Sequence, residues 1–450
     1  MIVTTGLVGY HGKHGCRLYC GLSGRREPHR KHYFPALLKP FNYDVNGCLH
    51  GNVNVRNLPK PSQDHYNVNL QNVLTSPSET QYRIRRLETG ISRPSLFLGL
   101  ELSSTLGLPY SCGSDIMHLG ALNLSDLMIS LWRGTIDCTK PDDKSTWSWA
   151  VLQPETWKAH GKAVEDTLHY LPSSFERPPR NIAEKLTSGY KAWEFLLYLY
   201  GLGPGLLLGI LPDSYYTNYC KLVHGMRIMN QHQITKSNIR EAYLALTSFA
   251  QEFELLYCQW KETQIHFVRP CLHSLVHLPT EVVRLGPPLC SSQWTLERTI
   301  GNLGEEIKQH SNLFANLSQR GIRRARVNAL KAMIPELDPE GSLETHLPCG
   351  SKDLRGGFIL LRAREPNPRP LQECEANALL RFMCIPSDSE FRVCHWAKLQ
   401  IPTGQTCYTA WKEKEKPLGK RRTARNVKVS LPCLIIKRSL KTTFYLSRSF

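Results

Sequence analysis

The chain has 450 residues, 41% of them hydrophobic and 9% aromatic, so it can bury a sizeable core, and its length favours two or three domains. Its fifteen cysteines are an odd number, which excludes complete pairing within one chain and favours a nuclear or cytoplasmic protein over a secreted one. The longest apolar run, residues 195–211, is interrupted by four glycines and a proline, so we expect no membrane span.

The net charge of +18 is concentrated at the two ends of the chain. Residues 1–40 contain seven lysines and arginines against one acid, and residues 411–450 contain twelve against two. Basic ends on a nearly neutral body are typical of proteins that bind a polyanion such as nucleic acid. The same ends would also serve solubility or nuclear import, and the sequence does not decide between these roles.

The predicted elements begin with an N-terminal region, residues 1–110, that shows little helical period apart from one helix near Glu79–Leu87. A helical domain over residues 111–338 follows, because apolar residues recur there at helical spacing. Its predicted helices are Leu122–Trp132, Pro154–Tyr170, Ala183–Tyr200, Asp213–Met229, Ser237–Trp260, Pro270–Leu278, Leu296–Lys308 and Arg320–Met333.

A small β-rich module is predicted over residues 339–428, followed by an irregular basic tail over residues 429–450. Alternating or β-branched runs predict the strands, and Gly404 is placed where a hairpin turn would fall. The expected elements are the strands Gly357–Arg364, Val393–Leu399 and Val427–Ile436 and the helix Leu371–Phe382. The predicted fold class is therefore mainly α.

Two groups of residues are candidate metal ligands. Cys16 and Cys20 lie close in sequence to His11 and His14, and together they would supply a four-ligand zinc knot. Cys-x3-Cys is a looser spacing than Cys-x2-Cys, so a thiol pair without metal is the alternative.

The second candidate group is His273, His277 and Glu281, which would share one face of an unbroken helix and could bind zinc. Pro279 would end or bend that helix, and the glutamate that marks a zinc protease is missing beside the first histidine. Buried, hydrogen-bonded histidines are the favoured interpretation.

Two further motifs carry a family resemblance. Asp115-x2-His118, continued by Leu122-Asn123-Leu124, and the stretch 294–308, which contains Glu297, resemble the back half of a CACTA (En/Spm)-type DNA transposase in its fungal form. The region from about 273 to 320 also resembles an uncharacterised domain that accompanies these transposases in plants.

The resemblance implies that residues 1–110 are an incomplete remnant of an RNase H-like catalytic region and that most of the helical domain is an insertion. It also implies that Asp115 and His118 belong to the Asp-x2-His signature that follows the second catalytic acid in such transposases. Glu297 would be the third acid of a DDE triad, which would hold Mg2+. The structural alternatives are that Asp115 caps a helix and that Glu297 is a surface acid paired with arginine.

The first two aspartates of such a triad are not found, because Glu27 and Asp44 are the only acids before residue 60 and neither is on a convincing strand. We therefore expect a truncated, transposon-derived protein without cleavage activity, whose partners are nucleic acid and a full-length transposase. Magnesium is expected only if an intact triad forms.

The alternatives to this function are a non-enzymatic helical interaction scaffold, a fragment that makes no stable protein and, least favoured, a metal-dependent nuclease. The residues predicted to contact phosphates are Lys412, Lys414, Lys420, Arg421, Arg422, Arg425 and Lys428.

Overall fold

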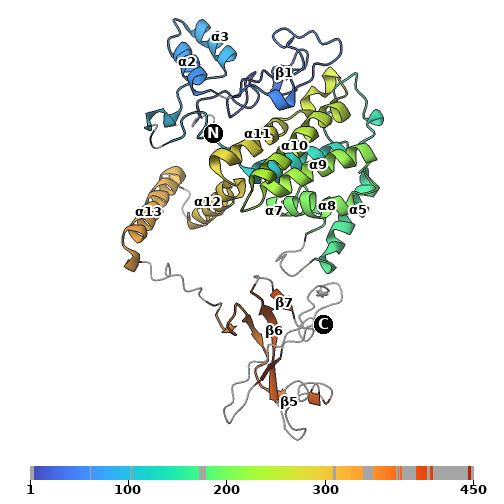
Figure 1. Cartoon of the computed structure of the whole chain (residues 1–450), viewed down its shortest axis with the longest axis vertical. Coiled ribbons are helices and arrows are strands. Elements are labelled where there is room, and N and C mark those ends of the chain that lie inside the picture. The colour runs from blue at the N-terminus through green and yellow to red at the C-terminus, as the bar shows by residue number, and fades with distance from the viewer. Residues whose placement is uncertain are drawn as a thin grey trace. The chain divides into compact units, whose positions relative to one another are not determined.

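The computed structural model is mainly helical, with a small, largely antiparallel sheet near the C-terminus. It describes residues 5–60, 62–101, 103, 105–171, 179–307, 311–337, 347, 349–370, 373, 376–377, 392–402, 406–408 and 444–446. The chain divides into unit 1, Met1–Val164 with Arg180–Glu306, and unit 2, Glu165–Pro179 with Ile307–Phe450. Both units are drawn in Figure 1.

Three helices form the centre of unit 1. They are α9 (Asp213–Met229), α10 (Lys236–Phe253) and α11 (Pro270–Leu285), and they lie side by side in Figure 1. On α10, apolar residues recur at helical spacing and are fully buried, among them Leu246 and Phe249. Complete burial of one such side chain contributes about 1.5–3 kcal/mol, so these residues stabilise the packing of α10 against its neighbours.

Shorter helices surround this centre. The π-helix η4 (Met117–Leu124) leads directly into α4 (Ser125–Trp132), whose Trp132 is fully buried. The others are η5 (Lys144–Thr146), α5 (Pro154–Asp166), α6 (Ile182–Lys185), α7 (Ala192–Leu196), η7 (Leu197–Leu202), α8 (Gly203–Leu206), η8 (Glu254–Cys258), η9 (Glu262–Phe267), η10 (Pro288–Ser291) and α12 (Trp294–Glu306).

The N-terminal part of unit 1 contains the helical pair α2 (Gln63–Leu74) and α3 (Glu79–Thr89) and the short 3-10 helices η1 (Val55–Asn57) and η2 (Leu96–Gly99). Its strands, within the described residues, are the two-residue β1 (Arg25–Arg26) and β2 (Tyr33–Phe34), paired antiparallel. This short hairpin is much smaller than the RNase H-like sheet to which the resemblance relates the segment.

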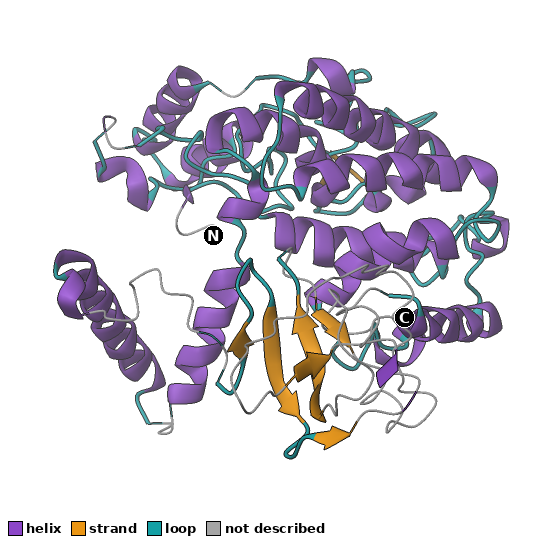
Figure 2. Cartoon of the chain, turned by 60° about the horizontal axis from the view of Figure 1, so that its bottom comes forward, coloured by secondary structure: helices purple, strands orange, loops and turns teal. Residues whose placement is uncertain are grey.

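Unit 2 contains the helix α13 (Leu313–Met333), the short turn η11 (Pro335–Leu337) and the sheet shown in Figure 2. Strands β3 (Lys352–Asp353), β4 (Ile359–Arg364), β6 (Arg392–Gln400) and β7 (Thr406–Tyr408) pair antiparallel in that order. Strand β6 also pairs with β5 (Arg369–Pro370) and, in parallel, with β8 (Phe444–Leu446). Leu360, Trp396 and Leu399 form the buried core of this sheet.

The predicted helices mostly correspond to those of the structure, but α13 begins at Leu313, seven residues before the predicted start, and three other places differ. The helix expected over 183–200 is interrupted after α6, where Gly189 has φ +90°, a conformation that favours glycine and ends a helix. Pro279 was expected to end or bend its helix, yet α11 continues through it to Leu285. The helix α2 was not predicted, although its buried residues Tyr66, Leu70 and Val73 have helical spacing.

Several predictions for the C-terminal part fall outside the described residues. These are the turn at Gly404, the strand Val427–Ile436, most of the helix Leu371–Phe382, and the tail from 429 onward apart from β8. The predicted strands Gly357–Arg364 and Val393–Leu399 correspond to β4 and β6. No helix in the described parts of the chain is both long enough and apolar enough to span a membrane.

Candidate metal centre

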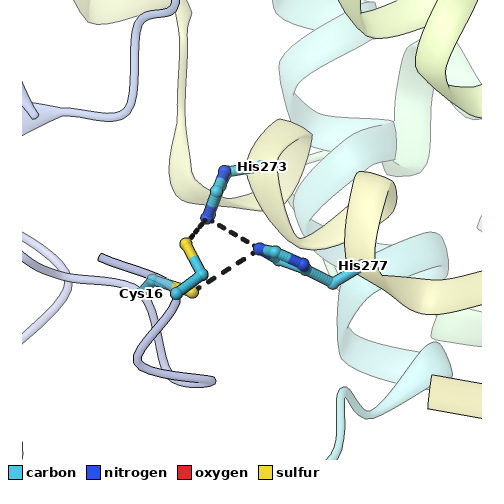
Figure 3. A group of neighbouring side chains, drawn as sticks. Cys16, His273 and His277 are labelled. Atoms are coloured by element: carbon cyan, nitrogen blue, oxygen red, sulfur yellow. Dashed lines mark hydrogen bonds between the residues drawn. The ribbon is translucent and has the colours of Figure 1, made fainter. Parts of the chain in front are cut away.

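Two cysteines from the N-terminal segment meet two histidines from α11 (Figure 3). The Sγ atom of Cys20 lies 3.3 Å from Nε2 of His273, and the Sγ atom of Cys16 lies 3.7 Å from Nε2 of His277. The two Nε2 atoms are 3.0 Å apart, and all four ligand atoms lie within 4.8 Å of one another. Four such atoms form the donor set of a Cys2His2 zinc site.

The spacings fit a tetrahedral ion. With Zn–S bonds of about 2.3 Å and Zn–N bonds of about 2.0–2.1 Å, neighbouring ligand atoms are roughly 3.3–3.8 Å apart. The distances of 3.0, 3.3 and 3.7 Å in this group need only small adjustments to reach those values. The buried group of two cysteines and two histidines could therefore hold a metal ion such as zinc.

Local structure explains how the two halves are presented. His273 and His277 are four residues apart on α11, so their side chains project from one face of the helix. In the other half, Tyr19 has φ +55° and donates its amide to the Cys16 carbonyl, which turns the chain between the two cysteines. The hydroxyl of Tyr19 accepts a hydrogen bond from Asn69 on α2, which holds this turn in place.

Burial and hydrogen bonding suit the group to metal binding. Cys20 is fully buried, and His273 and His277 are 7% and 8% exposed. The hydrogen bond with Cys20 lowers the pKa of Cys16 well below its ordinary value, against the effect of burial, and nearby His273 lowers it further. The direction of this shift favours the thiolate form that binds metal ions, and a dication would favour loss of the second proton.

The predicted knot with His11 and His14 differs from this arrangement. His11 stacks on His32, with ring centroids 3.9 Å apart, and neither His11 nor His14 belongs to the metal-ligand group. The cysteines instead take their partners from α11, because the turn at Tyr19 directs them towards that helix. The histidines of α11 are buried and hydrogen-bonded, as the favoured interpretation predicted, but with the cysteines they also form a group that could hold a metal ion, which that interpretation did not expect.

Glu281, predicted as a weak third ligand with these histidines, has a different role. Its carboxylate accepts hydrogen bonds from the amide and the hydroxyl of Ser114, at 2.6 and 2.9 Å. Burial raises the pKa of Glu281, and the bonds from Ser114 oppose that shift. Glu281 therefore fixes the segment before η4 to α11, one turn beyond the metal-ligand histidines.

The residues of the family-like motifs also meet, although 182 positions separate Asp115 from Glu297. Asp115 Oδ2 accepts the His118 amide at 2.9 Å and faces His118 Nδ1, while Oδ1 accepts the amide of Gln293 at 2.9 Å. His118 Nε2 lies 3.6 Å from Glu297 Oε1. Asp115 thus both caps the start of η4 and holds the beginning of α12.

The electrostatics of this acid–histidine–acid chain favour a charged Asp115. Burial raises the pKa of Asp115, but hydrogen bonds from the amides of His118 and Gln293 and from the His118 ring outweigh burial and lower it overall. Among the described residues, no other group of three or more acidic, histidine or cysteine ligands converges on one point, so a magnesium triad is not assembled there.

Both groups border one cavity of about 830 Å3 in unit 1. Cys16 and His273 line it from the metal-ligand group, and Asp115 and His118 line it from the acid–histidine–acid chain. Lys13 and Arg17 also line the cavity, although the sequence did not single them out. Their signal was their position beside the cysteine pair in the basic N-terminal segment.

The predicted phosphate-contacting residues of the tail, 412 to 428, lie outside the described residues. The chain matches no protein-family model, no curated protein and no solved structure.

Proposed function

We propose that this chain is a transposon-derived protein, descended from the C-terminal part of a CACTA (En/Spm)-type transposase, that binds zinc and nucleic acid in the nucleus without cutting DNA. One observation carries the proposal: Cys16 and Cys20 meet His273 and His277 in one buried group. The α11 histidines lie in the region from about 273 to 320 that carries part of the resemblance, so their convergence with the cysteine pair supports descent from a metal-binding ancestor.

In this proposal the metal acts as a structural cross-link. It ties the basic N-terminal segment to α11, which packs in the helical centre of unit 1. Residues 1–40 carry a net charge of +6, and Lys13 and Arg17 of this segment line the cavity beside the cysteines. Held in a fixed position, these side chains provide phosphate contacts, which supply affinity without base specificity.

The proposal includes loss of cleavage. Two-metal phosphoryl transfer requires several carboxylates that converge on the ions. In the described part of the chain, Asp115 and Glu297 are linked only through His118, and no third carboxylate joins them. The remaining role is accessory, either on nucleic acid directly or together with a full-length transposase.

The test uses the purified full-length chain. We expect one zinc ion per molecule by elemental analysis, and nucleic-acid binding that weakens steeply as salt rises. Cys20→Ser should lose both the zinc and much of the affinity, while Cys48→Ser, at an equally buried cysteine outside the group, should keep both. Absence of zinc, or absence of binding at low salt, would refute the proposal.

A second candidate function is a protein-interaction scaffold, and a different observation favours it. The stretch around η2 exposes four large apolar side chains, with Leu96 69% and Leu100 51% accessible and Phe97 and Leu98 between them. Contiguous exposed apolar residues mark interaction surfaces. Association through this stretch would persist at high salt and would be lost on Leu96→Ser, whereas phosphate binding would show the opposite behaviour.

A further inference from the structure

A short ladder of aromatic rings stands at the cavity of unit 1. The rings of Tyr10 and His11 have centroids 4.0 Å apart and are tilted by 43°, and His11 stacks on His32 at 3.9 Å with an interplanar angle of 17°. Tyr10 is 56% exposed and His32 is exposed as well, so both ends of the ladder face solvent. Tyr10 and His11 line the cavity.

The backbone holds the ladder in place. A tight turn closes at Gly12, whose amide donates to the Gly9 carbonyl at 2.8 Å and places Tyr10 and His11 at its tip. The amide of Tyr33 donates to the His11 carbonyl at 3.1 Å, which positions His32 at the start of β2. The turn at residues 9–12 and the backbone bond between Tyr33 and His11 therefore hold the three rings near one another.

The ladder is chemically suited to stacking on a flat, neutral ligand. Burial and the adjacent His32 both lower the pKa of His11, which keeps its imidazole neutral at physiological pH. Among the described residues, no hydrogen bond or ion pair involves the ring nitrogens of His11 or His32. The imidazole of His11 thus acts neither as a metal ligand nor as a cation.

Positive charge lies beside the ladder. Lys13 and Arg17 line the same cavity, and within the described residues neither forms an ion pair. Two of the three carboxylates that line the cavity are already engaged, Asp115 with His118 and Asp126 with Arg269 at 2.6 Å. The side of the cavity next to the rings therefore carries unpaired positive charge.

We propose that the Tyr10–His11–His32 ladder stacks an unpaired nucleobase while Lys13 and Arg17 hold the adjoining phosphates, so that the ligand is single-stranded nucleic acid. This inference rests on the proposed nucleic-acid binding and narrows it. Bases inside a duplex are already stacked on one another, whereas every unpaired base offers a free face to aromatic side chains. Interleaved rings and cations are the recurrent composition of single-strand sites.

The experiment measures fluorescence anisotropy of a labelled oligothymidine, about 12 nucleotides long to span a typical site, and of a duplex of equal length, with the full chain. We expect the single strand to bind more tightly. Tyr10→Ala and His32→Ala should each weaken single-strand binding about tenfold with an unchanged salt slope, since stacking releases no counterions. His32→Phe, which retains a ring, should restore the affinity.

The matched control is Phe41→Ala. Phe41 is 70% exposed and stacks on Trp260 with centroids 5.3 Å apart, but neither residue lines the cavity. This substitution should leave affinity unchanged, and Lys13→Ala should reduce the salt slope by about one phosphate contact. Two outcomes would refute the ladder inference and leave the proposed function standing. The first is that the ring variants bind as well as the wild-type chain, and the second is that duplex binds as tightly as single strand. If the wild-type chain binds neither ligand, the proposed function fails with it.

Discussion

Removal of the metal should lower the melting temperature of unit 1. A matched substitution can separate this effect from changes in packing. A ligand that binds only the folded state stabilises it by RT ln(1 + [L]/Kd), which is about 4.1 kcal/mol at a thousandfold excess over Kd. With an unfolding entropy of about 2.1 cal/mol/K per residue over the residues of unit 1, this corresponds to roughly 7 °C in Tm. We expect a metal chelator to lower the Tm of the zinc-loaded chain by about that amount.

Cys20→Ser separates the metal contribution from packing. The new hydroxyl would be buried among Leu22, Leu37 and Val276 and beside His273, which costs up to about 1–3 kcal/mol without any metal. Cys48→Ser buries a hydroxyl at another fully buried cysteine and estimates that cost. In chelator the two variants should melt together, and with zinc present Cys20→Ser should melt well below Cys48→Ser. Scanning calorimetry measures both. Equal Tm values for the two variants in zinc would refute the metal assignment.

Three further predictions concern buried polar groups of unit 1. Burial raises the pKa of Glu254 to about 7, although the amides of Leu37 and Leu38 donate to its carboxylate. Because this folded-state pKa exceeds the unfolded value, the free energy of unfolding should decrease as the pH rises from about 4.5 to 7. In urea unfolding measured across that range, Glu254→Gln should make the free energy of unfolding less dependent on pH. Asp115→Asn should lower the free energy of unfolding by about 1–2 kcal/mol at neutral pH, because the carboxylate accepts the His118 amide. Since the pKa of Asp115 is lowered in the folded state, the difference in stability between the variant and the wild-type chain should vanish as the pH falls through that lowered pKa. Chemical denaturation at several pH values measures this difference. Arg25→Met should cost about 3 kcal/mol, because its buried guanidinium donates to three carbonyl groups that would lose their partner; an unchanged urea midpoint would contradict this.

Helical periodicity predicted the body of the molecule well. The helix over Asp213–Met229 was predicted with the bounds that the structure shows, because its apolar residues repeat regularly and Pro212 precedes it. The predictions were wrong where local signals compete. The chain turns at Gly189, between α6 and α7, within an apolar pattern. Pro279 is accommodated inside α11, where Glu281 on the following turn is anchored by Ser114.

The candidate site was predicted in halves. The sequence singled out the cysteine pair and the histidine pair, but local spacing joined Cys16 and Cys20 to His11 and His14. The structure instead places Cys20 beside His273, which is 253 positions away, and only the packing of the N-terminal segment on α11 decides that contact. A pair of thiols and a pair of imidazoles are each half of the donor set of a tetrahedral zinc site. This complementarity was the feature of the sequence that could have indicated the pairing of the two groups.

The long separation between the two halves of the metal group has a consequence during protein synthesis. The chain emerges from its N-terminus, so Cys20 leaves the ribosome long before His273, which follows 253 residues later. At about 5–20 residues per second, the thiols wait roughly 13–50 s for their imidazole partners. Throughout that interval the nascent chain carries two thiols without their histidine partners, so the complete set of four proposed ligands exists only after α11 has been synthesised.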